Sequence, residues 1–484
     1  MVLRALALGV LRFCVGKLAD WLYKFALLLK LYVGVLERDA LRAGERGRGG
    51  SEGAAQARID EGGQAWIEFC ESLKALADYV AVPPEGDRPA SEATGAAAVD
   101  ALDRREGLRY ITRILRGGVE AFLESWDPAY PVLRPLPYNV KLGADNPDNL
   151  YMYGTVSGAF EYRIHGTRGT VTYLSFGCYS GSRPGQGSTQ PDHLDSSRLV
   201  TQEDGSLEIF LTPQPRGKNW LRLPADASRI VVRQTFLDRA KEVPADIHIE
   251  RLPLATPAAV QAAAAAASAS GAASIPIVDP ASGREDKPAL TAGQVVSGLA
   301  GASVFINGSV MQFQAWSRLF ASRPNTLFCL DHDVYMSAWA DPAIHFLHGY
   351  WRLGPRQALL IQATPPECPY WNFQLDNWWM ESLDYANHPA TTVNKATAAV
   401  MPDKSICLVV AHTDPRRADG GPDSLAALLD PALLAGVSWI DTAHHSHGTM
   451  GLRWVLAKQH PVPRCTVVEL GRPLAAAIAA GVCL

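Results

Sequence analysis

The sequence predicts an α+β protein: an antiparallel β-sandwich or jelly roll, with N-terminal and inserted helices packed around it. Two observations lead to this prediction. Short segments with alternating side chains, separated by Gly, Pro, Asn and Asp, fill residues 139–253 and return at 346–470. Helical periodicity occupies the regions before and between them. The economical interpretation is one two-layered sandwich built from both β-rich regions.

The helical elements come first in the chain. A Gly- and charge-rich linker is expected over 40–60, followed by periodic apolar residues at 65–80 and 103–126. A third helical pattern lies at 293–328. The predicted organisation, in order, is an amphipathic helix at 1–38, a helical region at 39–135, a first β-rich half at 136–254, an Ala-rich linker with a helical insert at 255–345, and a second β-rich half with candidate site loops at 346–484.

Length, charge and cysteine usage bound the class of protein. At 484 residues the chain is too long for one ordinary core, so two or three packed units are expected. A formal net charge of −4 argues against a nucleic-acid-binding protein. The eight cysteines are scattered without a C-x-x-C pair, which is typical of reduced thiols. The expected location is therefore the cytoplasm.

The first helix of the chain is predicted to be basic and amphipathic. Five of its charged side chains fall within roughly 140° of the helix circumference: they are Arg12, Lys17, Asp20, Lys24 and Lys30. No uncharged run approaches the length of a membrane-spanning helix, and no signal-peptide cleavage site follows. Three alternatives stay open for residues 1–36: peripheral contact with the inner membrane surface, docking on a second subunit, or packing on the protein's own body.

The stretch Tyr370–Tyr385 is the most informative part of the chain because aromatics, amides and carboxylates are concentrated in it. Its first half alternates like a strand. Trp371, Phe373 and Leu375 point to one face, and Asn372, Gln374 and Asp376 point to the other. A polar row beside several tryptophans favours a pocket for an apolar ligand with one polar handle. The alternative is a core strand that runs into a solvated turn.

The candidate catalytic groups are carboxylates and imidazoles of the second β-rich half, and nine of the twelve histidines lie at or after position 332. They are Asp376, Glu381, His412, Asp414, Asp441 and His445. Burial beside tryptophan raises a carboxyl pKa and makes the group a useful acid. The histidine loops favour acid–base assistance, zinc or iron ligation, or ordinary surface loops. Their spacing fits no standard metal signature, so neither a metal nor another cofactor is predicted.

The candidate substrate-binding groups are aromatic residues and one arginine. They are Tyr151, Tyr153, Arg163, Trp371, Trp378 and Tyr385. Tyrosines and an arginine on one side of a sheet orient a hydroxyl or carboxylate. The Asp145–Asn149 segment before them is interpreted first as a turn, because Asp and Asn around Pro form turns by themselves. Arg109, Arg113 and Arg116, with Glu106, lie at helical spacing and are interpreted as an ion-paired helix face rather than an anion site.

Several motifs resemble an uncharacterised bacterial family that carries the "domain of unknown function twelve-fourteen". They are Glu106–Arg113, Asn146–Tyr151, Tyr162–Gly166, Asn219–Pro224, Tyr370–Leu375, His412–Pro415 and Trp439–Thr442, followed by His445 and Gly448. The resemblance implies a jelly-roll β-sandwich and no settled activity. In the family the Asp-Pro element runs almost directly into the Trp-Leu-Asp-Thr element. Here residues 416–437 intervene, and the departure favours a lid or a contact surface.

The leading functional hypothesis is a non-redox acid–base enzyme. It would be a lyase, hydratase or hydrolase that acts on an apolar small molecule such as an isoprenoid, a steroid or an aromatic compound. No serine-hydrolase, P-loop or zinc-protease motif is present, and no Rossmann unit is indicated. Two alternatives remain: a lipid- or glycan-binding or assembly module without turnover, and a metal-dependent enzyme that uses the C-terminal histidines.

Overall fold

A computed structural model of the chain describes residues 51–81, 100–183, 187–253, 277–278, 285–336 and 338–481. The amphipathic helix predicted for residues 1–38 lies outside the described residues, and so do the three alternatives for its partner. The Ala-rich run at 255–271 lies outside them as well.

Long helices form where the periodic patterns predicted them. They are α2 (Ser51–Ala81), α3 (Ala101–Val119), which continues as the π-helical turn η2 (Glu120–Glu124), and α5 (Ala292–Ala321). The linker predicted over 40–60 is wrong in its second part, because α2 begins at Ser51. Phe69, Leu76 and Val80 of α2 are buried in one cluster with the apolar residues of α3 and α5. The free energy gained by burying these apolar faces outweighs the loss of helix stability, roughly 1 kcal/mol, caused by each glycine inside the helices.

The first β-rich half forms two sheets that share one core. Their strands are β1 (Arg134–Pro135), β2 (Asn149–Thr155), β3 (Tyr162–Thr167), β4 (Tyr173–Arg183), β5 (Gly187–Asp195), β6 (Ser206–Thr212), β7 (Trp220–Arg222), β8 (Ala227–Thr235) and β9 (Asp246–Arg251). The sheet orders are β1-β2-β8-β4-β5 and β7-β6-β3-β9. Phe176 and Val232 of one sheet and Ile164 and Leu211 of the other belong to the same buried cluster. We call these sheets the first pair.

The second β-rich half forms a second pair of sheets together with a strand at Thr326–Phe328 from the predicted helical insert, so the boundary predicted at residue 346 is too late. Its strands are β12 (Thr326–Phe328), β13 (Ile344–Arg352), β14 (Gln357–Ala363), β15 (Tyr370–Leu375), β16 (Thr392–Asn394), β17 (Ile406–Ala411), β18 (Val437–Asp441), β19 (His447–Val455) and β20 (Arg464–Glu469). The orders are β12-β13-β19-β15-β16 and β18-β17-β14-β20. Phe373 and Trp454 of one sheet and Leu408 of the other share a core.

The prediction of a mostly antiparallel α+β fold is confirmed, whereas the single sandwich built from both halves is wrong. No described strand of the first half pairs with a strand of the second. Each half has enough strands to bury its own apolar faces, and strands near in sequence pair most readily. The jelly-roll form of the sheets stays a prediction.

The strand topology explains the additional segment at residues 416–437, where the sequence departs from the family that it resembles. β17 and β18 pair in parallel, and parallel neighbours require a crossover connection. The crossover carries η4 (Ala418–Asp423), α7 (Leu425–Leu428) and α8 (Pro431–Ala435), and it packs beside α9 (Arg472–Gly481) on the outer face of the second pair. The remaining short elements are β10 (Ile277–Val278), β11 (Glu285–Asp286), α6 (His332–Met336) and η3 (Pro389–Thr391).

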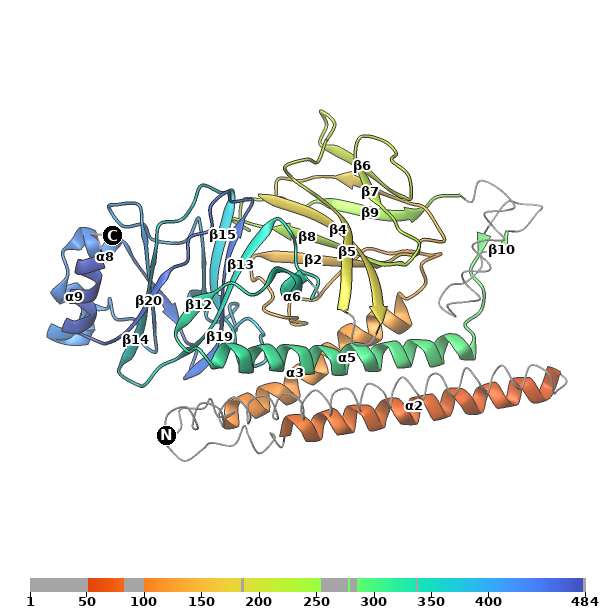
Figure 1. The fold of residues 1–484 in the computed structure, drawn as a ribbon, viewed down its shortest axis with the longest axis horizontal. Helices are drawn as coiled ribbons and strands as arrows, with labels where there is room; N and C mark the ends of the chain where they lie inside the picture. Colours follow the sequence, from red (N-terminus) through yellow and green to blue (C-terminus); the bar gives the residue numbers. More distant parts are fainter. Residues whose placement is uncertain are drawn as a thin grey trace, which may run out of the picture.

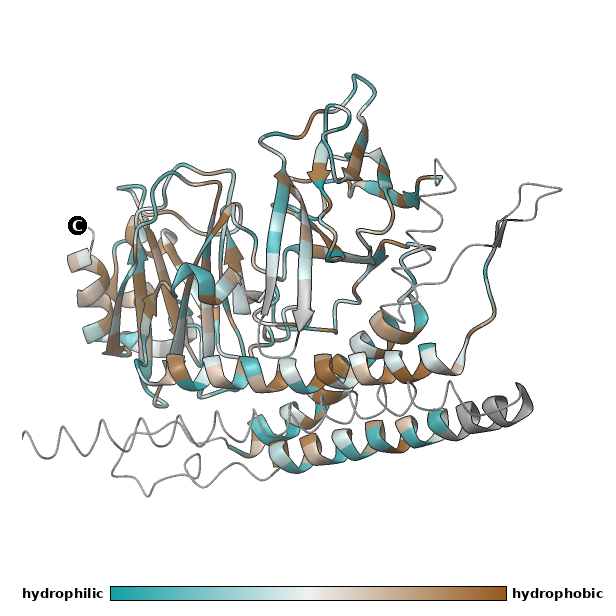
Figure 2. Cartoon of the chain, turned by 45° about the vertical axis from the view of Figure 1, so that its right-hand side comes forward, coloured by the Kyte–Doolittle hydropathy of each residue, from teal (hydrophilic) through white to brown (hydrophobic). Residues whose placement is uncertain are grey.

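Helices α2, α3 and α5 lie along one side of both pairs of sheets (Figure 1). α5 is the one helix in the described part of the chain that is long and apolar enough to cross a membrane, but half of its most apolar window is buried inside the protein. It contacts α2, α3 and β13 and is therefore packed as a core helix. In Figure 2 hydrophobic colours predominate in the strands of the second pair, whereas hydrophilic colours alternate with them along α2.

Candidate binding site at the junction of the two halves

The alternation predicted for strand β15 is confirmed. Its three apolar side chains, Trp371, Phe373 and Leu375, lie in the core of the second pair. Its polar side chains, Asn372, Gln374 and Asp376, point the other way and are also fully buried. The solvated-turn alternative therefore does not hold, and the polar row faces the first half of the chain.

Arg453 of the neighbouring strand β19 organises this polar row. Its guanidinium donates hydrogen bonds to Gln374 Oε1 at 2.6 Å and to Asn372 Oδ1 at 3.3 Å. A third hydrogen bond reaches the carbonyl oxygen of Ala144, in the loop before β2. Gln374 Nε2 in turn donates to the Asp145 carbonyl at 2.8 Å. The network therefore joins the second pair of sheets to a loop of the first half.

The Asp145–Asn149 segment behaves as a turn and also joins the halves. Asn146 Oδ1 accepts the backbone N–H of Asp148, as in an Asx turn. The Asp148 carboxylate accepts Tyr370 Oη at 2.7 Å and Asn394 Nδ2 at 2.9 Å, both from the second half. The turn-forming interpretation is confirmed, and its polar side chains have long-range partners as well.

Asp376 ends the polar row. Gln374 Nε2 donates to its Oδ1 at 2.6 Å. Burial raises the pKa of Asp376 to about 7, although the hydrogen bond from Gln374 and the nearby charge of Arg453 oppose this shift. A carboxyl with this pKa exchanges its proton near neutral pH.

A cavity of about 100 Å³ lies beside the network, between the two halves and α5. Its apolar wall is mainly aromatic and includes Phe313, Trp316, Tyr335, Trp339 and Phe346. Tyr151 and Tyr153 of β2 also line it, as two of the candidate substrate-binding residues. Its charged groups are Arg233, Arg453 and Asp145. An aromatic wall with a few converging polar groups is typical of a small-molecule site.

The two arginines of the cavity differ in their partners. Arg233 lies 4.0 Å from the carboxylate of Asp341 and donates to Tyr179 Oη. Arg453 is only 4% exposed, and its hydrogen bonds go to two side-chain amides and one carbonyl. Within the described residues no carboxylate lies within ion-pair distance of it. Asp145, the one acid on the cavity wall, accepts both the N–H and the hydroxyl of Ser382.

His348 is a neutral imidazole at the same cavity. It is 5% exposed and stacks on Phe320 with ring centroids 5.3 Å apart. Burial, with a contribution from Arg453, lowers the pKa of His348 to about 3. Its Nδ1 has no hydrogen-bond partner among the residues that the structure describes. This ring nitrogen is therefore available to a ligand as a polar partner.

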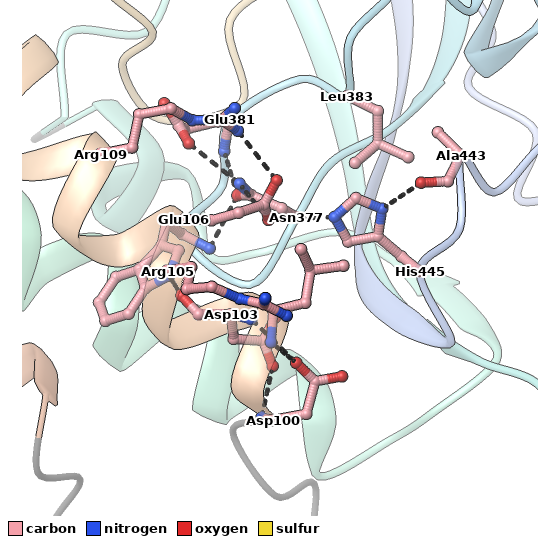
Figure 3. A network of polar contacts seen from close by, with 12 residues as sticks. Asp100, Asp103, Arg105, Glu106, Arg109, Asn377, Glu381, Leu383, Ala443 and His445 are labelled. Atoms are coloured by element: carbon pink, nitrogen blue, oxygen red, sulfur yellow. Dashed lines mark hydrogen bonds and ion pairs between the residues drawn. The ribbon is translucent and has the colours of Figure 1, made fainter.

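A second buried network brings Glu381 and His445 near each other (Figure 3). Asn377 Nδ2 donates to Glu381 at 2.9 Å and to Glu106 of α3 at 3.0 Å. His445 Nε2 lies 3.0 Å from the same Glu106 carboxylate. Burial would raise the pKa of Glu106, but His445 outweighs it and the pKa is lowered; Glu106 correspondingly raises the pKa of His445. Each partner of this imidazole–carboxylate contact therefore favours the charged form of the other.

The sequence predicted only some of the contacts that α3 makes in this network. It interpreted Glu106, Arg109 and Arg113 as an ion-paired face, and Arg109 does pair with Glu106 at 2.9 Å. Arg113, however, pairs with Glu381 at 2.6 Å, across the helix–sheet contact. Asn377, which links the two carboxylates, carried no signal of its own in the sequence.

The loops of the other candidate catalytic residues lie side by side, because Ala411 and Asp441 pair across β17 and β18, but their side chains contact other partners. His412 Nδ1 lies 2.9 Å from Thr442 Oγ1. Asp414 is paired with Arg416 at 2.8 Å, and Asp441 lies 3.2 Å from His388. None of these groups lines the cavity. The crossover at 416–437 contributes no residue to its wall either, so it does not cover this cavity.

Four candidate substrate-binding residues also lie away from the cavity. Arg163 is on the outward face of β3, where it pairs with Glu208 and Glu250 while Ile164 points into the core. Trp371 packs edge-on against Trp454 inside the second pair. Trp378 is buried beside α5, and the ring of Tyr385 lies under the Lys141 ammonium at 4.8 Å.

The fold and this site together define an α+β protein with an arginine-containing cavity between two pairs of sheets. No family model matches the chain, and no curated protein matches it. Among solved structures, an uncharacterised protein from Burkholderia cenocepacia is 34% identical, with a TM-score of 0.70 over 88% of this chain and 99% of that one. The chain belongs to the same family as that protein. The VPA0106 protein from Vibrio parahaemolyticus has 11% identity and a TM-score of 0.36, over 75% and 98% of the chains.

Proposed function

We propose that the cavity binds a compact anion with an apolar or aromatic body, such as a small carboxylate. The observation that supports this proposal is the environment of Arg453. Buried charges in proteins are normally paired, whereas this guanidinium donates hydrogen bonds only to neutral groups among the described residues, and Asp148 and Asp376 interact with it only through longer-range charge effects. Arginine binds a carboxylate through parallel hydrogen bonds. A ligand carboxylate would therefore supply the missing counter-charge.

The size of the cavity narrows the ligand class. An engineered cavity of about 150 Å³ admits benzene, and this cavity measures about 100 Å³. Steroids and long isoprenoids are therefore disfavoured relative to a single-ring or short-chain acid. The rings of Phe313, Trp316 and Phe346 provide an apolar surface for such a body.

The proposal is tested with benzoate as the anionic probe and benzamide as a neutral probe of the same shape. Isothermal titration calorimetry on the full chain should show benzoate binding at least tenfold more tightly. Arg453→Met should abolish this preference, because a charge-assisted hydrogen bond contributes about 1.5–3 kcal/mol. Arg453→Lys should retain part of it, since the positive charge remains.

The matched control is Arg163→Met, which removes an arginine that already has carboxylate partners on the outer sheet face. This variant should bind benzoate as the unmodified protein does. Thermal unfolding establishes that each variant is folded. Equal binding of benzoate and benzamide by the unmodified protein, or unchanged preference in folded Arg453→Met, would contradict the proposal.

A second candidate function is acid–base turnover of the bound anion, and it is favoured by Asp376, whose pKa is about 7. Asp376 reaches Arg453 only through Gln374, so the ligand would have to extend toward the polar row. Nuclear magnetic resonance can follow turnover of whichever carboxylate binds most tightly. A rate that depends on a group titrating near pH 7 and disappears in Asp376→Asn supports an enzyme. Binding without turnover in either protein supports a binding module.

A further inference from the structure

Three potential metal ligands converge at the first turn of α3. Asp100 and Asp103 lie at this turn (Figure 3), and His447 begins strand β19. His447 Nε2 lies 3.7 Å from Asp100 Oδ2 and 3.4 Å from Asp103 Oδ2. One ligand atom from each residue fits within a span of 4.8 Å. We propose that Asp100, Asp103 and His447 bind a divalent transition-metal ion such as Zn²⁺.

The separations are those expected of atoms around one ion. Zinc binds histidine nitrogen and carboxylate oxygen at about 2.0–2.2 Å, which at tetrahedral angles places neighbouring ligand atoms about 3.3–3.6 Å apart. A good N–H···O hydrogen bond is shorter, at about 2.7–3.2 Å. His447 Nε2 is thus too far from either carboxylate for a good hydrogen bond and at a suitable distance for shared coordination.

The histidine is also fixed in the way that metal ligands usually are. His447 is 7% exposed, and its Nδ1 lies 2.7 Å from the hydroxyl of Tyr350, which is fully buried. Donation from Nδ1–H to this hydroxyl would leave the Nε2 lone pair directed at the two aspartates. Such an outer partner sets the tautomer and the ring orientation of a ligating histidine. Tyr350 is therefore assigned a positioning role.

Helix capping explains only part of this cluster. Asp100 Oδ1 accepts the N–H groups of Leu102 and Asp103, and Asp103 Oδ2 accepts that of Asp100, as in a capping box. Capping requires no buried histidine opposite the two carboxylates. The positive end of the helix dipole, equivalent to about half a charge, opposes a cation there, but two carboxylates outweigh it.

The donor set indicates the kind of metal and its access. One imidazole and two carboxylates suit zinc and other first-row divalent ions more than calcium, which prefers six to eight oxygens. The Asp100 side chain is 45% exposed, so an ion can enter from solvent. Three protein ligands leave at least one position for water, as in catalytic zinc sites. This inference is independent of the proposed carboxylate cavity, since the three residues do not line it.

The experiment titrates Zn²⁺ into the chelator-treated full chain by calorimetry, with Co²⁺ absorption as a report on coordination geometry. We expect one ion per chain. His447→Gln and Asp103→Asn should each weaken binding by about 100-fold or more, and Tyr350→Phe by about tenfold. The control is His248→Gln, because His248 and Asp246 form an exposed pair 3.3 Å apart that should not bind the ion.

Asp100→Asn keeps the test decisive if the buried variants fail to fold, since its side chain is nearly half exposed. It should still weaken Zn²⁺ binding at least tenfold while thermal unfolding of the metal-free protein stays close to that of the unmodified chain. No Zn²⁺ binding by the unmodified protein at 100-micromolar concentration, or equal affinity in Asp100→Asn, would overturn the proposal.

Discussion

At the scale of single residues, the carboxyl of Asp376 departs clearly from its ordinary chemistry. Burial raises its pKa from 3.8 to about 7. Between these values the unfolded chain has released the proton while the folded chain still holds it. Folding stability attributable to Asp376 is therefore greatest below pH 4 and declines as the pH rises to 7. The total decline is at most about 4 kcal/mol, since one pKa unit corresponds to about 1.4 kcal/mol.

Asp376→Asn should remove this dependence, because an amide does not titrate. Urea unfolding of both proteins between pH 4 and pH 8 gives the difference in the free energy of unfolding. We expect the variant to gain relative stability steadily up to about pH 7 and then no further. Asp333→Asn is the control, because the Asp333 side chain is 98% exposed. A flat difference for Asp376→Asn would show that the carboxyl is ionised throughout.

The period-2 alternation of β15 predicted which side chains form the polar row, since each strand face is fixed by sequence alone. It did not predict that Arg453, from a strand distant in the sequence, donates a hydrogen bond to this row. It also did not predict the hydrogen bond from Arg453 to the carbonyl of Ala144. Those partners depend on strand order and on how the two halves meet. Local periodicity predicts neither the strand order nor the contact between the two halves.

At the scale of elements, the contact of α3 with the loop after β15 depends on Gly107. A Cβ at this position would overlap the Trp379 ring and Val80 of α2. The Trp379 indole N–H also donates to the Asp103 carbonyl at 2.7 Å. Gly107→Ala should gain about 1 kcal/mol of helix propensity but lose about 1–3 kcal/mol to overpacking. We expect a net loss of stability.

Gly63→Ala in α2 is the matched substitution, because nothing lies within 4 Å of its added Cβ. It should raise the free energy of unfolding by up to about 1 kcal/mol. Thermal and urea unfolding measure both variants. A stabilised Gly107→Ala protein would mean that α3 and Trp379 are further apart than described. The periodic pattern predicted α3, but it did not predict that the absence of a side chain at Gly107 allows the Trp379 ring to pack against the helix.

At the scale of the whole molecule, Asp341 joins the two halves. It is fully buried in the loop before β13, a strand of the second pair, and accepts Tyr173 Oη at 3.0 Å and Ser175 Oγ at 2.6 Å from the first pair of sheets. His193 Nε2 lies 3.0 Å from it. Burial would raise the pKa of Asp341, but His193 and Arg233 outweigh it and hold the pKa well below its usual range. The carboxylate is therefore ionised in the folded protein.

Asp341→Asn should lower the free energy of unfolding by about 3–5 kcal/mol at pH 7, because it leaves the buried Arg233 guanidinium without its carboxylate partner. The stabilising effect of Asp341 is present above the unfolded pKa of about 4 and is lost as the pH falls further. Urea unfolding at pH 7 and at pH 3 measures both statements. Asp246→Asn is the control, since this carboxylate is 81% exposed and should change stability by less than about 0.5 kcal/mol. An equal effect of the two variants would contradict the role of Asp341.

Composition and periodicity predicted the α+β class and the positions of the β-rich halves and the helices. They did not predict that each half closes its own pair of sheets, because pairing is decided by contacts between distant segments. The crossover at 416–437 shows the same limit: its sequence favoured a lid or a contact surface, but only the parallel pairing of β17 with β18 explains why it is there.

The position of α5 in the chain has a consequence for synthesis on the ribosome. The helix ends at Ala321, whereas β19, which covers part of it, is complete only at Val455. At about 5–20 residues per second, roughly 7–27 s pass between the two events. During this interval α2 and α3 are covering helices already made, and the nascent chain carries a helix that is long and apolar enough to cross a membrane. Removing α2 should therefore reduce the yield of folded protein in cells more than it reduces refolding of the finished chain.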